Sequence, residues 1–468
     1  PQSHSELCPS RAFNAPMAST QLVWFRQDLR TLDQPALRAA AERGPVLGLY
    51  VLDDETPGMW KLGGASRWWL HHSLAALKAE LEKLGSTLIL RRGRSAKVVW
   101  DVAEETRAGA IHSTRHYEPW WREAECERGD FCIVHEGDVL HEPAAIRSGS
   151  GKPFKIYGPY YRALEAHLPP PEPKPAPERL TRPEQLPASD RLEDWNLLPT
   201  RPNWAKGFAI WEPGASGAEK HLRRFAEQAE HYAARRDLPS TAGTSQLSTH
   251  LHFGEISPRE LWHGVGGAAG DKFRRELAWR DFSRHVILAD PDMGEAEQRP
   301  LGLRTRSGPD ADRDFAAWSK GRTGYPLVDA GMRELWVTGW MHNRARLVTA
   351  SFLVKHLLID WKRGALWFWD TLCDADYANN SQNWQWIAGT GFDSQPFYRV
   401  MAPLAQSERF AAADYIRRWV PELAHLSDAQ IHDPWGHGVA PADYPQPLVD
   451  HREGRERALK AFRERAAA

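Results

Sequence analysis

The sequence predicts a doubly wound α/β domain followed by a larger domain made entirely of helices. Three observations support this. Over residues 19–145, short apolar runs alternate with segments whose apolar residues have helical spacing, a pattern typical of a parallel sheet flanked by helices. A proline-rich stretch, residues 168–189, fits neither a helix nor a central strand and indicates an extended connector within 146–213. Over residues 214–468 the spacing is helical, with few strand signals.

The α/β domain is expected to contain five strands. Each is a short apolar run that precedes or follows a helical pattern. No GxGxxG motif follows the first run, so this domain is not expected to hold a dinucleotide in the Rossmann manner. The expected strands are 22–26, 46–52, 87–91, 110–114 and 131–135, and the helices between them include 65–84 and 96–106.

The helical domain repeats apolar residues three and four positions apart over most of its length. Residues 1–16 lack such periodicity and precede Met17, so they resemble an expression scar more than a signal peptide and are left out of the fold prediction. The helices expected after the connector are 221–235, 258–264, 271–288, 325–338, 341–363, 411–419 and 451–466.

Composition excludes several classes of protein. The 60 basic and 61 acidic residues balance to a net charge of −1, so binding to DNA would need a local basic patch. The four cysteines form no CxxC motif or cluster, which argues against a zinc site, an iron–sulfur cluster or a disulfide framework and fits a reducing cytoplasm. No apolar run is long enough for a membrane span. We expect a monomer, and no metal site.

Two stretches carry polar groups where packing alone would not require them. Residues 243–248 (GTSQLS) combine hydroxyls with a glycine-led turn, which can hold a diphosphate, although a helix N-cap is the commoner explanation of such a motif. Glu276, Trp279 and Arg280 are three and four residues apart and share one helical face. Such a face can grip a flat, polar ligand, and it can equally be a surface ion pair beside an indole.

Two later stretches point to a buried polar cavity. Asn343, Arg346 and Leu347 lie on one face at the start of an apolar helix, where a guanidinium needs a partner. Asp374 or Asp376 could provide it. The segment DADYANN and the following Trp384-Gln385-Trp386 place two acids, two amides and two indoles within 13 residues. A polar cavity with aromatic walls accounts for them best.

Taken together, these residues closely resemble the photolyase/cryptochrome family. The motifs WMHNRAR, DADYANN and NWQW occur in the family's order and spacing, and the likeness runs from VWFRQDLR (23–30) to YIRRWVPEL (415–423) and HDPW (432–435). Within the family the chain is similar to bacterial photolyases that repair cyclobutane pyrimidine dimers. DTLCDADYANN and NWQWIAG are also similar to the branch related to plant cryptochromes, so the subclass stays open.

The resemblance implies FAD, folded back on itself between the helices. Gln246 stands where the family usually has an arginine, and Asn380 matches the amide that faces flavin N5. An amide there can accept from N5–H or donate to an unprotonated N5. The residues that match the family's cofactor contacts are Tyr232, Thr244, Ser245, Gln246, Leu247, Ser248, Phe273, Glu276, Arg280, Trp340, Asn343, Arg346, Asp374, Asp376 and Asn380.

The resemblance also implies a substrate, namely DNA damaged by ultraviolet light, with the dimer flipped out of the stack. A crosslinked pyrimidine pair stacks poorly, so its extrusion is easier. Reduced FAD, excited by blue light, would transfer one electron to the dimer and later recover it. Glu276 and Asn380 are the expected catalytic residues, and Glu276 is expected to bond a pyrimidine carbonyl. The expected substrate contacts are Glu276, Trp279, Asn343, Arg344, Leu347, Trp386 and Arg399.

Other features depart from the family pattern. The family's tryptophan chain for reducing FAD has three members, and Trp384 and Trp361 match the inner two. The outer position falls in residues 303–309, which contain no tryptophan, so we expect the electron to use Trp367 or Trp369.

Two further tryptophans bear on the antenna. Trp120 and Trp121 stand where members with a folate antenna carry Asn and Glu. The antenna chromophore therefore stays open, a folate is not favoured, and the two indoles are expected to pack at the domain interface.

Two other functions within the family remain alternatives. A cryptochrome binds FAD for light signalling, commonly with a long C-terminal tail, whereas the segment after Trp435 is short here. A (6-4) photolyase uses two active-site histidines, and the matching positions are Asn343 and Leu347, which do not shuttle protons near neutral pH. Basic residues near the cavity are candidates for contacts with DNA phosphates: Lys152, Lys155, Arg344, Arg399, Arg417 and Arg418.

Overall fold

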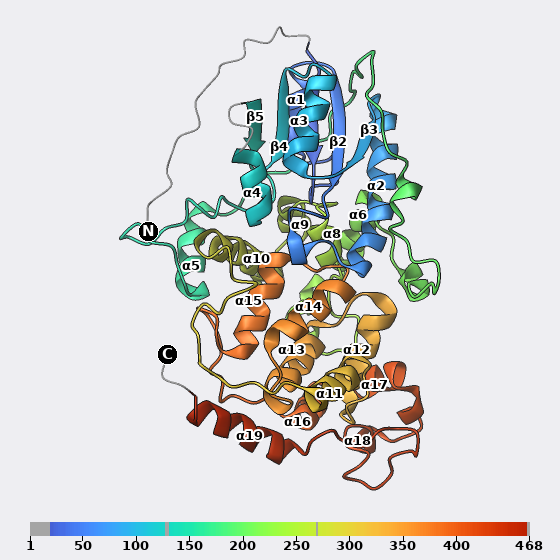
Figure 1. The fold of residues 1–468 in the computed structure, drawn as a ribbon, viewed down its shortest axis with the longest axis vertical. Helices are drawn as coiled ribbons and strands as arrows, with labels where there is room; N and C mark the ends of the chain where they lie inside the picture. Colours follow the sequence, from blue (N-terminus) through green and yellow to red (C-terminus); the bar gives the residue numbers. More distant parts are fainter. Residues whose placement is uncertain (1–18, 127–130, 268–269, 466–468) are drawn as a thin grey trace.

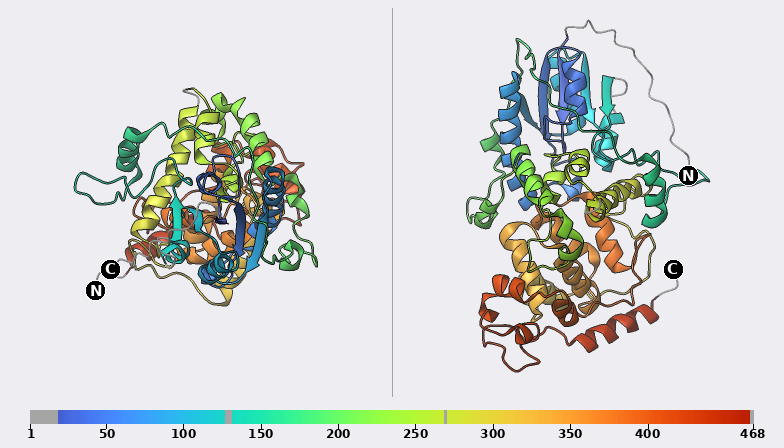
Figure 2. Two further views of the ribbon diagram at one scale, coloured as in Figure 1. Left: turned by 90° about the horizontal axis from the view of Figure 1, so that it is seen from above. Right: turned by 180° about the vertical axis from the view of Figure 1, so that it is seen from behind.

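The computed structural model describes residues 19–126, 131–267 and 270–465. The expectation about residues 1–16 lies outside the described residues. Figures 1 and 2 show the α/β domain at one end of an elongated molecule and the C-terminal helix at the other. The predicted fold class is confirmed.

The α/β domain is built on a parallel sheet with the strand order β3-β2-β1-β4-β5. Its central strand is buried on both faces because alternate side chains enter two different cores. Leu22 and Trp24 pack with one set of helices, and Val23 and Phe25 pack with the other. The strands are β1 (Gln21–Phe25), β2 (Val46–Leu52), β3 (Leu88–Arg92), β4 (Ala110–Thr114) and β5 (Cys132–His135), close to the predicted bounds.

Four helices flank this sheet, and Figure 1 shows α2 extending from it toward the helical domain. Gly85 ends α2 with a φ of 103°, a left-handed conformation that suits glycine. The helices are α1 (Pro35–Ala41), α2 (Gly64–Leu84), α3 (Ser95–Glu105) and α4 (Pro119–Cys126).

The connector is not a simple bridge between the domains. Its proline-rich part returns to the α/β domain, where the backbone N–H of Leu180 donates to the Leu84 carbonyl and that of Val46 donates to the Thr181 carbonyl, each over 2.7 Å. The connector is extended there, as predicted, but it is hydrogen-bonded to the sheet domain. Short helical turns occur before and after this part: α5 (Tyr157–Leu164), Glu165–His167, Leu192–Trp195 and Lys206–Ile210.

The second domain is helical throughout the described residues. No helix in this part of the chain is long and apolar enough to cross a membrane. Its helices are α6 (Ala215–Ala226), α7 (Tyr232–Arg235), α8 (Ser248–His252), α9 (Pro258–Gly264), α10 (Asp271–Ala289), α11 (Pro309–Ser319), α12 (Pro326–Thr338), α13 (Asn343–Ser351), α14 (Trp361–Thr371), α15 (Tyr377–Ala388), α16 (Pro403–Arg409), α17 (Ala413–Trp419), α18 (Asp428–Ile431) and α19 (His451–Arg463).

Two predicted helices are wrong as single elements. The helix expected over 221–235 is divided between α6 and α7. Within the helix expected over 341–363, α13 ends at Ser351 and a π-helical turn follows over Phe352–His356. The chain then breaks from helical geometry at Leu358, whose φ is 51°. Asp360 then caps α14 by accepting from the backbone N–H of Lys362. Residues 348–359 are all buried, so the sequence there has the apolar run of a continuous buried helix and does not indicate the break.

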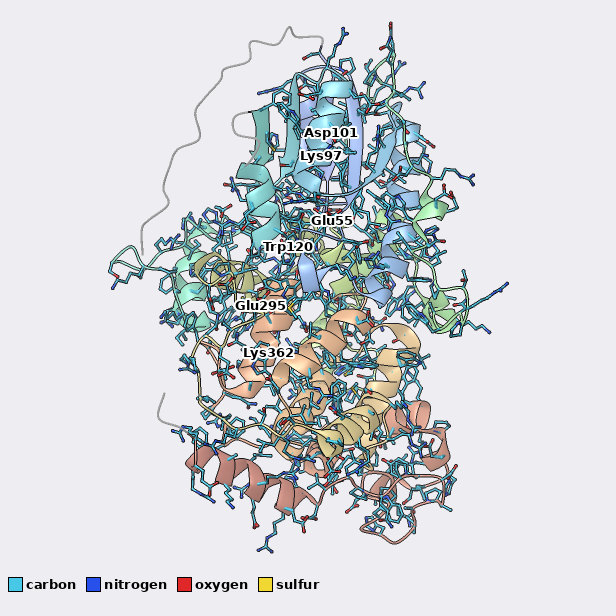
Figure 3. All side chains as sticks on the ribbon, in the orientation of Figure 1. Glu55, Lys97, Asp101, Trp120, Glu295 and Lys362 are labelled. Atoms are coloured by element: carbon cyan, nitrogen blue, oxygen red, sulfur yellow. The ribbon has the colours of Figure 1, made fainter. Side chains whose placement is uncertain are left out.

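Side chains from both domains meet at a wide interface. Glu255 accepts hydrogen bonds from the indole N–H of Trp69, from the Ser73 hydroxyl and from the backbone N–H of Gly214. Figure 3 shows Trp120 at the level where the two domains meet. Its ring lies 5.1 Å from that of Tyr377, so it packs across the interface as expected, whereas Trp121 packs edge-on against Trp24 within the α/β domain.

A close approach between α14 and α15 provides a test of this packing. A methyl group added to Gly364 would lie 2.1 Å from Cη2 of Trp384. Alanine normally favours a helix over glycine by about 1 kcal/mol, but this contact reverses the sign. We predict that Gly364→Ala lowers the free energy of unfolding by about 1–3 kcal/mol in chemical denaturation. Gly149→Ala, with open space at that position, is the matched control, and equal stability of the two variants would contradict the prediction.

Candidate functional site

A cavity of about 600 Å³ opens in the helical domain among α7, α8, α10, α13 and α15. Its volume is within the usual range for a site that binds a cofactor or another organic ligand. Residues expected from sequence to contact a cofactor or a substrate line much of its wall. They are Tyr232, Ser245, Ser248, Phe273, Glu276, Trp279, Arg280, Asn343, Arg344, Arg346, Leu347, Asp374, Asp376 and Trp386.

A smaller cavity of about 110 Å³ adjoins it between α13, α14 and α15. Asn343, Arg346, Leu347 and Asp374 line both cavities. Asn380 and Trp384 line only the smaller one. The expected flavin-facing amide and the innermost tryptophan of the expected electron chain therefore share one space.

The glycine-led turn contributes fewer residues than expected. Ser245 and Ser248 line the large cavity, but Thr244, Gln246 and Leu247 do not. The Leu247 side chain is buried in a hydrophobic core instead. Leu247 also occupies the N-cap position of α8 without a side-chain capping bond, so the alternative of a Thr or Ser cap is wrong. The expected contacts of Thr244, Gln246 and Leu247 with a cofactor therefore stay predictions.

Trp340 lies behind this turn and does not line the cavity. Its indole N–H donates to the Ser248 hydroxyl over 3.2 Å. Trp340 therefore supports a cavity residue from the side away from the cavity.

Arg346 pairs with Asp374, one of the two acids that the sequence offered as its possible partner. Its two terminal nitrogens donate to the two Asp374 oxygens over 3.0 and 2.8 Å, and its Nε donates to the Met341 carbonyl. Such a bidentate pair fixes the plane of the guanidinium. The pair lies where the two cavities join.

Asp376 pairs instead with Arg284, a residue that the sequence analysis missed. Arg284 donates to both Asp376 oxygens, over 2.7 and 2.5 Å. Burial alone would raise the pKa of Asp376, but the Arg284 guanidinium holds that pKa well below its ordinary value. A spacing signal existed, because Glu276, Arg280 and Arg284 follow one another at intervals of four on α10.

Arg280 lines the cavity, but its guanidinium is directed to the α/β domain. Its Nη2 donates to Asp138 over 2.5 Å. Asp138 follows β5 and also lies 3.6 Å from Arg284. The cavity wall and the domain interface therefore share one buried network of charges.

Two ion pairs stand at the expected substrate side. Glu276 is hydrogen-bonded to Arg236, and Arg344 donates to Asp237 over 2.8 Å. Arg236 and Asp237, which directly follow α7, were not singled out from the sequence, since only the fold brings them to α10 and α13.

Trp279 and Trp386 enter the large cavity from α10 and α15 respectively. Arg399 is exposed and does not line it. The expected contact of Arg399 with a substrate therefore stays a prediction, as do the phosphate contacts expected of Lys152, Lys155, Arg417 and Arg418. Arg417 already pairs with Asp414 and Asp428.

Asn380 is held by the helix opposite it. Its Nδ2 donates to the Ala365 carbonyl over 3.0 Å. This bond uses one of the two N–H groups of the amide and holds the side chain at the wall of the smaller cavity.

The electron-chain candidates differ in their surroundings. Trp384 packs against Phe368, and Trp361 is buried at the start of α14, one turn before the glycine that touches Trp384. Trp367 stacks on Trp336 at 6.2 Å between ring centroids. Trp369 instead faces the domain interface.

Buried polar atoms at the cavity wall suggest that a polar ligand belongs there. Within the described residues, Nε2 of His252 and Oε1 of Gln382 lack a hydrogen-bond partner, and Nδ1 of His252 lies 3.9 Å from Asp376 Oδ2. Serine hydroxyls and Tyr232 lie at one end and the Arg346–Asp374 pair at the other. Hydroxyls, an arginine–carboxylate pair and buried acceptors together fit a long cofactor with a diphosphate and a polar ring system.

Comparison with known proteins agrees with this assignment. Residues 273–464 match the model of the FAD binding domain of DNA photolyase, and residues 21–178 match that of DNA photolyase. The chain is 44% identical to a deoxyribodipyrimidine photo-lyase of Agrobacterium fabrum, covering 94% of this chain and 97% of that protein. It is 36% identical to Cryptochrome-1 of Arabidopsis thaliana, covering 94% and 70%.

A solved structure, that of a bacterial class III photolyase from Agrobacterium tumefaciens, superposes with a TM-score of 0.90 at 41% identity and covers 99% of both chains. Fold, site and sequence together define a two-domain flavoprotein with an FAD-binding helical domain. The chain belongs to the photolyase/cryptochrome family.

A buried carboxyl of α12, Glu334, bonds the N-cap residue of α13 and should make the stability of the protein depend on pH. Glu334 accepts from the His342 backbone N–H and from the Tyr415 hydroxyl, and burial raises its pKa from 4.5 to about 7. The folded state therefore holds a proton that the unfolded chain releases, so this stabilisation is present below pH 4.5 and is lost as the pH rises through about 7. We predict that Glu334→Gln reduces the loss of unfolding free energy between pH 5 and pH 8.

The measurement is denaturant unfolding of both proteins at the two pH values. Glu422→Gln is the matched control, because its ion pair with Arg333 keeps the pKa of Glu422 below the ordinary value and outside this window. Parallel pH curves for Glu334→Gln and the unmodified protein would contradict the prediction.

Proposed function

We propose that this protein is a deoxyribodipyrimidine photo-lyase that repairs cyclobutane pyrimidine dimers in DNA under blue light. The observation that carries the proposal is the convergence of Trp279 from α10 with Asn380 and Trp386 from α15 on two adjoining cavities. One pair of indoles faces the larger cavity, and the amide faces its inner extension. Sequence identity of 44% with a deoxyribodipyrimidine photo-lyase supports the same function.

FAD, when bound, supplies the light-driven one-electron chemistry that splits the cyclobutane ring. Ser245, Ser248 and Tyr232 would hold its diphosphate end, where they provide hydroxyl donors. The Arg346–Asp374 pair and Asp376 would hold the polar edge of the ring system. Asn380 would present its amide oxygen or its second N–H to the ring system, because only one of its two N–H groups bonds Ala365.

The substrate residues of this chain bind, orient and exclude water. Trp279 and Trp386 would pack on the two flat faces that a flipped-out dimer exposes. Glu276 is in an ion pair with Arg236, and an ionised carboxylate has only acceptor oxygens. It therefore suits the N3–H of a pyrimidine, and the expected bond to a pyrimidine carbonyl would have to come from a donor such as Arg236.

We infer that the electron that reduces photoexcited FAD enters the protein by way of Trp367. Trp384 lies 6.4 Å from Trp318, and Phe315 packs between Trp318 and Trp367 as a spacer that the electron crosses, not as a redox site. Trp367 then stacks on Trp336, which is 50% exposed and so provides an end at the surface. Trp369 donates to the Lys61 carbonyl and packs on Trp60, which points into the domain interface.

Substitution of the tryptophans tests this route. We predict that Trp384→Phe removes most light-driven reduction of oxidised FAD and that Trp367→Phe slows it about tenfold, because phenylalanine is much harder to oxidise than indole. Trp369→Phe is the matched control and should leave the rate within twofold of the unmodified protein. The measurement is loss of flavin absorbance under blue light with an external reductant, and a slow Trp369→Phe with a normal Trp367→Phe would reverse the assignment.

A repair assay tests the function itself. Purified protein with reduced FAD is mixed with an oligonucleotide that carries one thymine dimer and is illuminated with blue light. We predict that the thymines are restored, and chromatography of the oligonucleotide measures this. Trp279→Ala and Trp386→Ala should each weaken binding to that oligonucleotide about tenfold or more, since one aromatic stack on a base contributes about 1–3 kcal/mol. Trp204→Ala, in the connector, is the control.

Light signalling is the second candidate, favoured by the 36% identity with Cryptochrome-1. The same assay separates the two. Flavin bleaching without restored thymines would support signalling and would contradict repair.

A further inference from the structure

A short segment of the connector, residues 154–157, lies across the outside of the substrate side of the cavity. We call it the strap. It precedes and enters α5, and it contacts both α10 and the turn that follows α15. Neither Trp279 nor Trp386 shares an element with it. The strap is therefore bonded both to α10, which carries Trp279, and to the turn after α15, the helix that carries Trp386.

Tyr157 is the residue through which the strap meets α10. Its ring stacks flat on Trp279, with centroids 3.7 Å apart and planes 9° from parallel. Its hydroxyl donates to the Arg275 carbonyl, one helical turn before Trp279, over 2.9 Å. Trp279 lines the cavity and Tyr157 does not, so one face of the indole is covered by Tyr157 while its side chain still borders the cavity.

The strap is also held by the turn after α15. The backbone N–H of Tyr157 donates to Asp393 Oδ2 over 2.7 Å, and the Lys155 amine lies 4.4 Å from the centre of the Phe392 ring. Phe392 and Asp393 follow Trp386 closely in the sequence, just beyond the end of α15. A second anchor to α10 is the backbone N–H of Phe154, which donates to His285 over 2.8 Å.

We propose that Tyr157 is a positioning residue that holds the Trp279 indole in the orientation needed to receive a pyrimidine dimer and couples it to the wall of Trp386. This inference rests on the proposed repair function. An indole that is stacked before the substrate arrives loses little rotamer freedom on binding, whereas a free indole would lose more and so bind the substrate more weakly. A flat aromatic partner also fixes the tilt of the indole in a way that an aliphatic side chain does not.

The test compares Tyr157→Ala with Tyr157→Phe in the flavin-loaded, full-length protein. For Tyr157→Ala we expect the KM for an oligonucleotide with one thymine dimer to rise about 3- to 10-fold. The single-turnover repair rate at saturation should stay within twofold, because Asn380 and the inner cavity are unchanged. Binding of undamaged duplex should also stay within twofold. Tyr157→Phe keeps the ring and should restore the KM to within twofold.

Ile156→Ala is the matched control, since it shortens a strap side chain that is 45% exposed. If Tyr157→Ala fails to retain flavin, Tyr157→Leu keeps apolar bulk without a flat ring and is assessed by the same criteria. An unchanged KM, or equal weakening of damaged and undamaged DNA, would overturn the role of Tyr157. Unmodified protein that shows no preference for the dimer would overturn the proposed function, and with it this role.

Discussion

The relative position of α10 and α15, the walls that carry Trp279 and Trp386, depends on one buried guanidinium. Arg284 is fully surrounded by protein and lies between Asp376, at the N-cap of α15, and Asp138, which follows β5. An unpaired charge there would cost several kcal/mol, and removal of one partner from such a pair typically costs about 3–5 kcal/mol. α10, α15 and the α/β domain therefore assemble together. This constraint fixes where Trp279 and Trp386 stand before any ligand is present.

The same helix delivers the rest of the site through its four-residue spacing. Glu276, Arg280 and Arg284 form one line on α10, with Arg236, Asp138 and Asp376 as their partners. Each partner comes from a different segment. The line therefore joins α7, the end of the sheet and α15, and Trp279 lies beside it on α10. A reaction that needs binding and orientation rather than an acid or a nucleophile suits such a rigid frame.

The alternation of apolar residues and the short motifs predicted the strands and most of the cavity wall, because both depend on residues close together in the sequence. The strands came within one or two residues because their side chains are buried on both faces, and motifs identified most of the cavity wall. Pairing across the fold was harder: the sequence could not choose between Asp374 and Asp376, and it gave no reason to notice Arg236. Leu247 was assigned to the site from its motif, although its side chain packs in a core. The break at Leu358 was missed because a buried π-helical turn has the same apolar run as a continuous helix.

The strap extends this frame to the indole of Trp279, which takes no part in the charge network. Trp279 is anchored through its backbone in α10, but its ring could still rotate about its side-chain bonds. Tyr157 removes that freedom from outside the cavity, while its own backbone is held by Asp393 beside the α15 wall. Charges thus fix the helices and a ring stack fixes the indole. Because the connector supplies that ring, this segment contributes to selectivity for the damaged base without touching it.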